Sequence, residues 1–236
     1  MGVFGCVASS SFAAVAELMT TPNSLPTVLD VGERFCPTPG VTSAGMGPAT
    51  AVVADIIAGI TPFDDLEQRH MATTLDWLGS TDDIFRRAKP ATPSPHLVAY
   101  VVLIDPRERG VYLGQHLKAG LHLPMGGHVE PGEHPLAAAR REAAEELGIE
   151  ALFDLVGDAP LFLTRTTTVG QTAGHIDVSL WFVARGERAR EYPLDPDEFA
   201  GGLWWDLDPY GLPATDPHLP RFIRKLDSVL TPQAMP

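Results

Sequence analysis

Residues 127–149 constrain this chain more than any other stretch, because charged residues and glycines stand there at fixed distances. The spacing is G-x5-E-x7-R-E-x-x-E-E-x-G, and its fixed positions are Gly127, Glu133, Arg141, Glu142, Glu145, Glu146 and Gly148. With a background usage of about 0.07 at each of these positions, a chance match occurs on the order of once in 10⁸ tries. The pattern therefore predicts one defined local structure carrying one defined chemistry.

The second half of this stretch is predicted to be a helix. Pro135 suits a first helical turn, with Glu133 just outside it near the positive end of the helix dipole, and Gly148 is a suitable C-terminal stop. Apolar residues recur at helical spacing on one face, at Leu136, Ala139, Ala143 and Leu147. The helix therefore presents this face to a core. Before it, Gly126 and Gly127 form a predicted flexible loop.

Three carboxylates of this helix point to a metal. Glu142 and Glu146 lie one turn apart with Glu145 beside them, and like charges at this spacing repel each other. A hard cation would relieve the repulsion, and oxygen-only ligands favour Mg²⁺ or Mn²⁺ over zinc. The alternative is a solvated helix face joined by salt bridges. Gly127 and Glu133 upstream at the required distance favour the metal site.

The complete pattern resembles the Nudix box, and the chain resembles the Nudix hydrolase family. The resemblance covers the box without a departure at its charged positions. It implies an α/β fold, a Nudix-type α/β/α sandwich with a mixed sheet. It also implies an enzyme that hydrolyses a diphosphate linked to another group, usually in a nucleoside diphosphate derivative, with Mg²⁺ or Mn²⁺ as cofactor.

The resemblance assigns roles position by position. Glu142 and Glu146 are expected as direct metal ligands, Glu145 as a ligand or a holder of metal-bound water, and the Gly126 carbonyl as a further ligand. Gly127, Glu133, Arg141 and Gly148 are expected to form the scaffold, with Glu133 and Arg141 paired.

The catalytic base is left open by the box, because family members take it either from a box glutamate or from a later loop. The candidates outside the box are Glu198, Asp197, Asp177 and His175. The resemblance favours Glu198, because it precedes the predicted strand with Leu203-Trp204-Trp205, a setting where Nudix proteins often carry a functional acid. Solvent-facing turn positions are the alternative for each. His128, His175 and Asp177 are also candidate substrate-binding residues.

The substrate is where the sequence says least. The loop before the helix looks most like that of nucleoside triphosphate pyrophosphatases of the pool-cleaning type, with His128 where a lysine is common. A nucleotide sugar, another pathway-specific diphosphate, and a non-catalytic nucleotide-sensing domain are alternatives. Aromatic residues that could stack on a base are Trp181, Phe199, Trp204 and Trp205, although core packing suits most of them better.

Three regions are expected along the chain. Residues 1–46 have no sustained periodicity and are predicted to be poorly ordered. Residues 47–89 have helical periodicity, including a last short helix capped at Ser80–Asp83. Residues 90–236 are expected to form the Nudix domain. The helical extension is predicted to pack on the catalytic domain, to cover the leaving group, or to form a homodimer.

The Nudix domain alternates strand and helix signals. Strands are expected at 97–104, 111–115, 161–168, 176–183 and 202–207, and a C-terminal helix is expected after Asp216-Pro217. The unbroken apolar run 97–104 is typical of a buried central strand.

The composition restricts the partners. The net charge of −13 argues against a nucleic-acid polymer or an anionic membrane surface, but not against a small nucleotide whose phosphates a cation screens. No apolar run is long enough to span a bilayer. Cys6 and Cys36 lie outside the box region, so no disulfide framework is needed and a cytoplasmic location is expected.

Overall fold

The computed structural model describes residues 46–89 and 92–230. The helices of this part of the chain are α1 (Pro48–Ala58), α2 (Asp65–Leu78), α3 (Pro135–Leu147), α4 (Leu219–Leu230) and the short 3-10 turn Gly170–Thr172. The strands are β1 (His96–Asp105), β2 (Gly110–His116), β3 (Leu121–Leu123), β4 (Met125–His128), β5 (Phe162–Thr167), β6 (Ile176–Arg185) and β7 (Phe199–Asp206).

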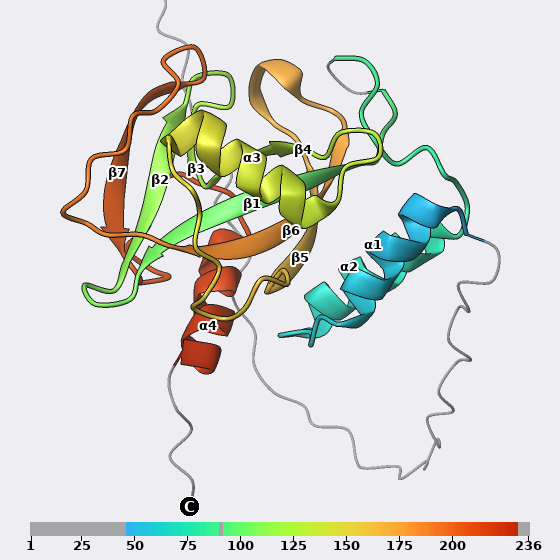
Figure 1. Ribbon diagram of the computed structural model, residues 1–236, viewed down its shortest axis with the longest axis horizontal. Helices are drawn as coiled ribbons and strands as arrows, with labels where there is room; N and C mark the ends of the chain where they lie inside the picture. The colour runs from blue at the N-terminus through green and yellow to red at the C-terminus, as the bar shows by residue number, and fades with distance from the viewer. Residues whose placement is uncertain (1–45, 90–91, 231–236) are drawn as a thin grey trace, which may run out of the picture. The chain divides into compact units, whose positions relative to one another are not determined.

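A mixed sheet is built around β1 (Figure 1). Strand β1 pairs in parallel with β6 along nearly its whole length, and its other edge pairs antiparallel with β4 at one end and with β2 at the other. Strand β5 continues the sheet beyond β6, while β3 and β7 pair with β2. The predicted central strand 97–104 is thus confirmed, with neighbours on both edges and side chains buried on both faces.

Each face of the sheet has its own apolar core. One core combines the apolar face of α3 with residues of α1 and α2, including Ile57, Leu78 and Leu147. The other lies under α4, where the Trp181 and Phe222 rings stack with centroids 5.2 Å apart. Burial of each such large side chain stabilises the fold by about 1.5–3 kcal/mol. The predicted α/β sandwich with a mixed sheet is confirmed, and α3 ends where expected, at Gly148 with a φ of 61°.

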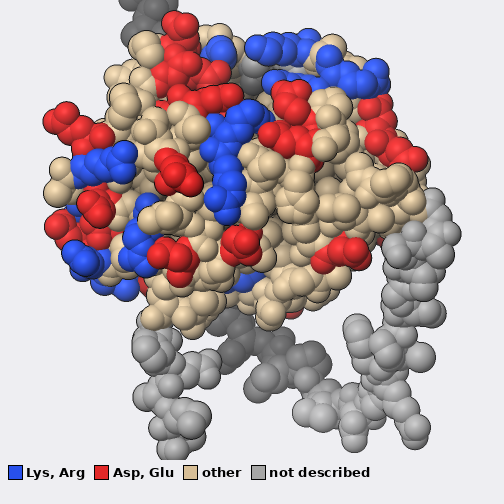
Figure 2. Space-filling view, in the orientation of Figure 1, with Lys and Arg blue, Asp and Glu red and all other residues tan. Residues whose placement is uncertain are grey.

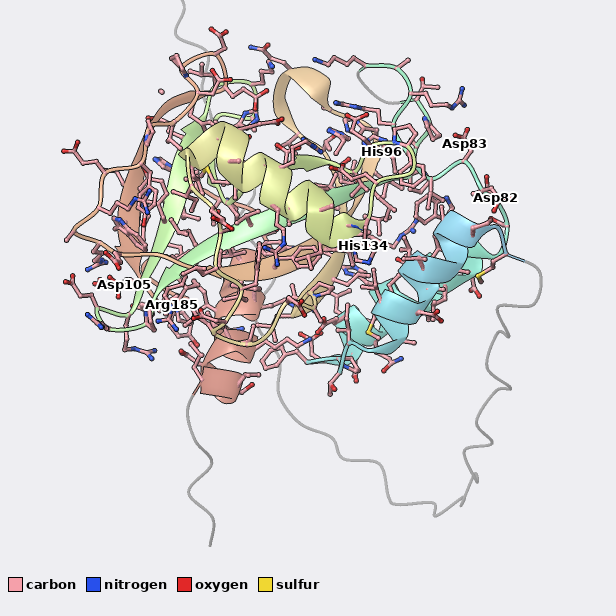
Figure 3. The ribbon with its side chains drawn as sticks, viewed as in Figure 1. Asp82, Asp83, His96, Asp105, His134 and Arg185 are labelled. Atoms are coloured by element: carbon pink, nitrogen blue, oxygen red, sulfur yellow. The ribbon has the colours of Figure 1, made fainter. Side chains whose placement is uncertain are left out.

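Two local predictions were wrong. The segment around Gly126 and Gly127 is a short strand, β4, because its backbone pairs with Val98–Val101 of β1. The last helix predicted after Ser80 is absent from residues 80–89. Asp82 instead accepts hydrogen bonds from Gly47 N (2.9 Å) and Thr50 Oγ1 (3.2 Å), so it caps the start of α1 (Figure 3).

Helix α2 is tied to helix α4 by a buried ion pair. Lys225 Nζ of α4 lies 2.8 Å and 3.0 Å from the two carboxylate oxygens of Glu67 of α2, whose side chain is fully buried. The same carboxylate accepts hydrogen bonds from Phe63 N (2.7 Å) and from Leu163 N of β5 (3.1 Å). The Glu67 side chain therefore connects α2 with β5 and with α4.

The structure describes two of the three regions expected along the chain. The third, the segment 1–46 expected to be poorly ordered, lies outside the described residues except for Met46. Helices α1 and α2 belong to the same compact unit as the sheet. The division into a helical extension at 47–89 and a Nudix domain at 90–236 stays a proposal. Among the described residues, no helix has the length and apolarity needed to cross a membrane.

Asp64 gives the extension a pH-dependent contribution to stability. Its side chain caps α2 by accepting from Glu67 N and also pairs with Arg221 of α4. The Arg221 side chain is the main cause that lowers the pKa of Asp64 to about 2. A depressed carboxyl pKa stabilises the fold fully above the unfolded value of 3.8, and this contribution is lost as the pH falls toward 2.

Asp64→Asn keeps a capping oxygen and removes the charge, so we expect it to lower the free energy of unfolding at pH 7 by about 1 kcal/mol. The difference from wild type should shrink between pH 4 and pH 2. Urea unfolding at several pH values measures both effects. Asp65→Asn, at an exposed position in the same helical turn, controls for the helix dipole. An equal loss in the two variants would mean that the Arg221 pair contributes nothing.

Candidate metal and phosphate site

The glycines of β4 allow the box helix to approach the sheet closely. A Cβ on Gly127 would overlap the Glu142 carboxylate, and a Cβ on Gly126 would overlap the Ala99 carbonyl oxygen. Gly126 has a φ of 139°, and its N–H donates a 2.7 Å hydrogen bond to Glu146 Oε2. The two glycines therefore bring backbone directly against two glutamates of α3.

Arg141 holds the site together. Its guanidinium pairs with both carboxylate oxygens of Glu133 at 3.0 Å and also donates to the His128 carbonyl oxygen at 3.0 Å. Further contacts join Arg141 to Glu142 (2.7 Å) and Glu145 (3.2 Å). These partners raise the pKa of Arg141, so the cation is permanent. The geometry joins Glu133 and Arg141 in the way the resemblance implies, with the forked ion pair fixing the loop to the helix.

The three helix glutamates are not equivalent. Glu142 and Glu146 are 8% and 4% exposed, whereas the Glu145 side chain is 59% exposed. Burial is the main cause that raises the pKa of Glu142, partly offset by Arg141. Burial likewise raises the pKa of Glu146 to about 9, with Glu142 and Glu198 adding to the rise. Two buried carboxylates that resist ionisation at adjacent positions are a ready binding site for a cation.

Glu198 joins this pair from a distant part of the chain. It directly precedes β7, and its carbonyl oxygen accepts a 2.8 Å hydrogen bond from Leu117 N after β2. Its side chain is half-buried and close enough to Glu146 to raise that group's pKa. The sequence-predicted candidate outside the box therefore lies beside the box glutamates. Asp197 is exposed, and among the described residues it does not line the cavity that these carboxylates face.

That cavity has a volume of about 570 Å³. Glu142, Glu145, Glu146 and Glu198 lie on its acidic side, and it is also bordered by cationic side chains, Arg86, Lys89 and Lys118. Acidic and basic side chains likewise alternate over the face drawn in Figure 2. Phe199 borders the cavity, whereas Trp181 is fully buried in the core under α4 and Trp204 and Trp205 do not line the cavity. Stacking on a base by these tryptophans is therefore not supported.

The three candidate substrate-binding residues come together at another part of the same cavity. His128, His175 and Asp177 surround His96, and one ligand atom from each of the four lies within 4.8 Å of the others. Sequence reasoning missed His96, because a histidine that opens an apolar strand looks like an ordinary core residue. It also missed Arg86, Lys89 and Lys118, which lie in loops with no distinguishing pattern.

The donor set of the acidic side fits a divalent metal of the magnesium type. Glu142 and Glu146 provide carboxylate oxygens, and Glu145 and Glu198 lie close by. No sulfur or imidazole nitrogen belongs to this group of four, and hard cations prefer oxygen ligands. The backbone of Gly126 adjoins Glu146 through its N–H.

In this α/β sandwich, glutamates of α3 lie beneath the glycines of β4 and face a cavity lined by both acidic and basic side chains. This arrangement is that of a hydrolase of the Nudix type. The family model described as "NUDIX domain" matches residues 94–226. The chain therefore belongs to the Nudix family, and it is a hydrolase. The match leaves α1 and α2 outside the family domain.

Solved structures with a similar fold come from several organisms. A Nudix-family hydrolase from Clostridium perfringens is 23% identical, has a TM-score of 0.44, and covers 58% of this chain and 99% of its own. Dihydroneopterin triphosphate pyrophosphohydrolase from E. coli is 17% identical, with a TM-score of 0.44 and coverage of 57% and 94%. No curated protein sequence matches the chain.

Proposed function

We propose that this hydrolase cleaves the diphosphate linkage of a nucleoside diphosphate joined to another group, with Mg²⁺ or Mn²⁺ as cofactor. Nucleoside triphosphates are the favoured substrate class, and a nucleotide sugar or a pathway-specific diphosphate is the alternative. The observation that carries the proposal is the cavity itself. Buried Glu142 and Glu146 occupy its acidic side, while Arg86, Lys89 and Lys118 supply charges suited to phosphate oxygens.

The metal would be held by Glu142 and Glu146, with Glu145 and the Gly126 carbonyl as further contacts. When bound, it stabilises negative charge that develops on the phosphate oxygens. The protein's own contribution is to fix these groups before the substrate arrives. Arg141 orients Glu142 and Glu145, and the Gly126 N–H orients Glu146.

We assign the general base to Glu198. In the proposed step, the oxygen of a water molecule bonds to one phosphorus, the bridging P–O bond breaks, and Glu198 accepts the proton of the water. Its half-buried side chain beside Glu146 supports this role. Of the other base candidates outside the box, His175 and Asp177 lie instead in the group around His96, and Asp197 is exposed and does not line the cavity. The intact acidic set also disfavours a purely sensing domain.

A substrate panel tests the proposal. Nucleoside triphosphates, nucleotide sugars and dinucleotides are incubated with Mg²⁺ or Mn²⁺, and the products are separated into pyrophosphate and phosphorylated leaving groups. We expect cleavage of at least one class, abolished by chelation of the metal and by Glu146→Gln. Failure of every compound with both metals, or equal cleavage by that variant, would overturn the proposal.

Gly127→Ala is expected to lower kcat about a hundredfold while leaving the fold intact. The new methyl group would displace the Glu142 carboxylate, and a misplacement of about 1 Å in a catalytic group has this order of effect. Gly59→Ala is the matched control, because Gly59 has an ordinary helical φ of −78° and its Cβ would meet its nearest atom at 3.4 Å. Unchanged turnover by Gly127→Ala would show that the position of Glu142 is not critical.

A further inference from the structure

Three histidines and an aspartate form a second group of metal-ligating side chains, the histidine cluster: His96, His128, His175 and Asp177. Strand register brings them together. His96 of β1 is the parallel partner of Asp177 in β6, and His128 of β4 is the antiparallel partner of Val98, two residues along from His96. His175 precedes Asp177 by two residues. Because side chains alternate between faces, all four lie on one face of the sheet.

The hydrogen bonds of the histidines direct their other ring nitrogens toward the centre of the cluster. His96 Nδ1 lies 2.6 Å from the carbonyl oxygen of Pro93. A carbonyl oxygen can only accept, so Nδ1 donates to it and Nε2 is the nitrogen that faces the cluster. His96 Nε2 is 2.9 Å from Asp177 Oδ1. The His96 side chain is fully buried, so water does not separate the two atoms.

His175 repeats this arrangement. Its Nδ1 lies 3.0 Å from Thr168 Oγ1, and its Nε2 lies 3.3 Å from the same Asp177 oxygen. Asp177 Oδ1 is buried and makes no hydrogen bond. A buried carboxylate oxygen without a hydrogen bond is costly, and a cation between it and the ring nitrogens would stabilise it.

His128 completes the group. Its Nε2 is 3.0 Å from His96 Nε2, so its ring reaches the centre of the cluster from β4. A histidine ring nitrogen is a common metal ligand. Because His128, His175 and Asp177 line the cavity, an ion can enter from it.

We propose that the histidine cluster binds one divalent transition-metal ion of the zinc type, separately from the cation at the glutamates. Zinc bonds of about 2.0–2.1 Å to nitrogen and oxygen place tetrahedral ligand atoms roughly 3.3 Å apart. Three of the separations in the cluster, 2.9, 3.0 and 3.3 Å, are close to this, and the widest is within 4.8 Å. Three imidazoles favour zinc over magnesium.

Such a site would hold β1, β4 and the start of β6 together at the cavity. Four protein ligands close the coordination sphere, as in structural zinc sites. The hydrogen bonds between His96 and Pro93 and between His175 and Thr168 provide the outer contacts that orient metal-bound histidines. This assigns His128, His175 and Asp177 to a metal in place of direct contact with the substrate.

Zinc retention by the full chain tests the proposal. Metal-free protein is dialysed against Zn²⁺ in a large excess of Mg²⁺, which occupies the glutamates, and bound zinc is then measured by elemental analysis. We expect one equivalent in the wild type, and at least tenfold weaker retention in His175→Ala and Asp177→Asn. Zn²⁺ should raise the Tm of the wild type but not of these variants.

Two controls separate this site from other sources of zinc. His122→Gln removes a histidine of β3 outside the cluster, and Glu146→Gln removes a glutamate of the other site; both should retain zinc as the wild type does. Co²⁺ bound to the wild type should give the visible absorption of a four-coordinate ion, a result that needs no variant. A wild type that retains no zinc, or cluster variants that retain it fully, would overturn the proposal. Neither result bears on Mg²⁺-dependent hydrolysis, which the substrate panel measures independently.

Discussion

Glu146→Gln is expected to lower kcat about a thousandfold on the best substrate of the panel. Loss of one metal-binding carboxylate removes several kcal/mol of charge stabilisation in the transition state, and each 1.36 kcal/mol is a factor of ten in rate. The fold should persist. Gln has the same shape, and its side-chain oxygen can still accept the hydrogen bond from Gly126 N. Steady-state kinetics at saturating substrate measures the effect.

Metal binding can be followed in the same variant without a substrate. Mg²⁺ should raise the Tm of the wild type by mass action, and it should leave the Tm of Glu146→Gln nearly unchanged. Glu150→Gln is the matched control, because Glu150 is exposed just beyond the same helix. If Mg²⁺ stabilised the Glu146 variant as strongly as the wild type, the assignment of this metal ligand would be wrong.

Lys225→Met is expected to lower the free energy of unfolding by about 3–5 kcal/mol. Removing one partner of a buried ion pair leaves an uncompensated charge, here Glu67, whose side chain is fully buried beneath α4. A loss of this size is a large share of the stability of a typical domain. Urea unfolding followed by circular dichroism measures it.

Two further variants isolate the ion pair from general disturbance of α4. Asp227→Asn, also on α4, breaks an exposed pair with Arg109 of the turn between β1 and β2, and it should cost less than about 1 kcal/mol. Adding Glu67→Gln to Lys225→Met should recover part of the loss, because it removes the buried charge. A Lys225 variant no less stable than the Asp227 variant would show that α2 and α4 do not depend on this contact.

The box helix was predictable because its information is local. The position of Pro135, the glycine stop and the spacing of apolar residues all lie within a few turns of one helix. The pairing of Glu133 with Arg141 follows from the same short stretch. The difference between exposed Glu145 and its buried neighbours was not predictable to the same degree, since it depends on how closely β4 approaches α3.

Local patterns also led to two errors with a common cause. Asp82 looked like the cap of a following helix, yet it caps α1, 35 residues earlier in the chain. Gly126 and Gly127 looked like a free loop, yet their backbone completes the sheet beside β1. In both cases, a partner distant in sequence satisfied the hydrogen-bonding groups that the local pattern had assigned to near neighbours.

By itself, the sequence determined the family and most strands and helices of the family domain, and it singled out the box carboxylates proposed as metal ligands, because these depend on spacing along one segment. Only the tertiary structure decided that Glu198 lies beside Glu146, that Glu67 pairs with Lys225, and that His96 has three ligating neighbours. These contacts depend on strand register and helix packing between segments far apart in the chain. Register is a property of paired strands, and no single strand carries it.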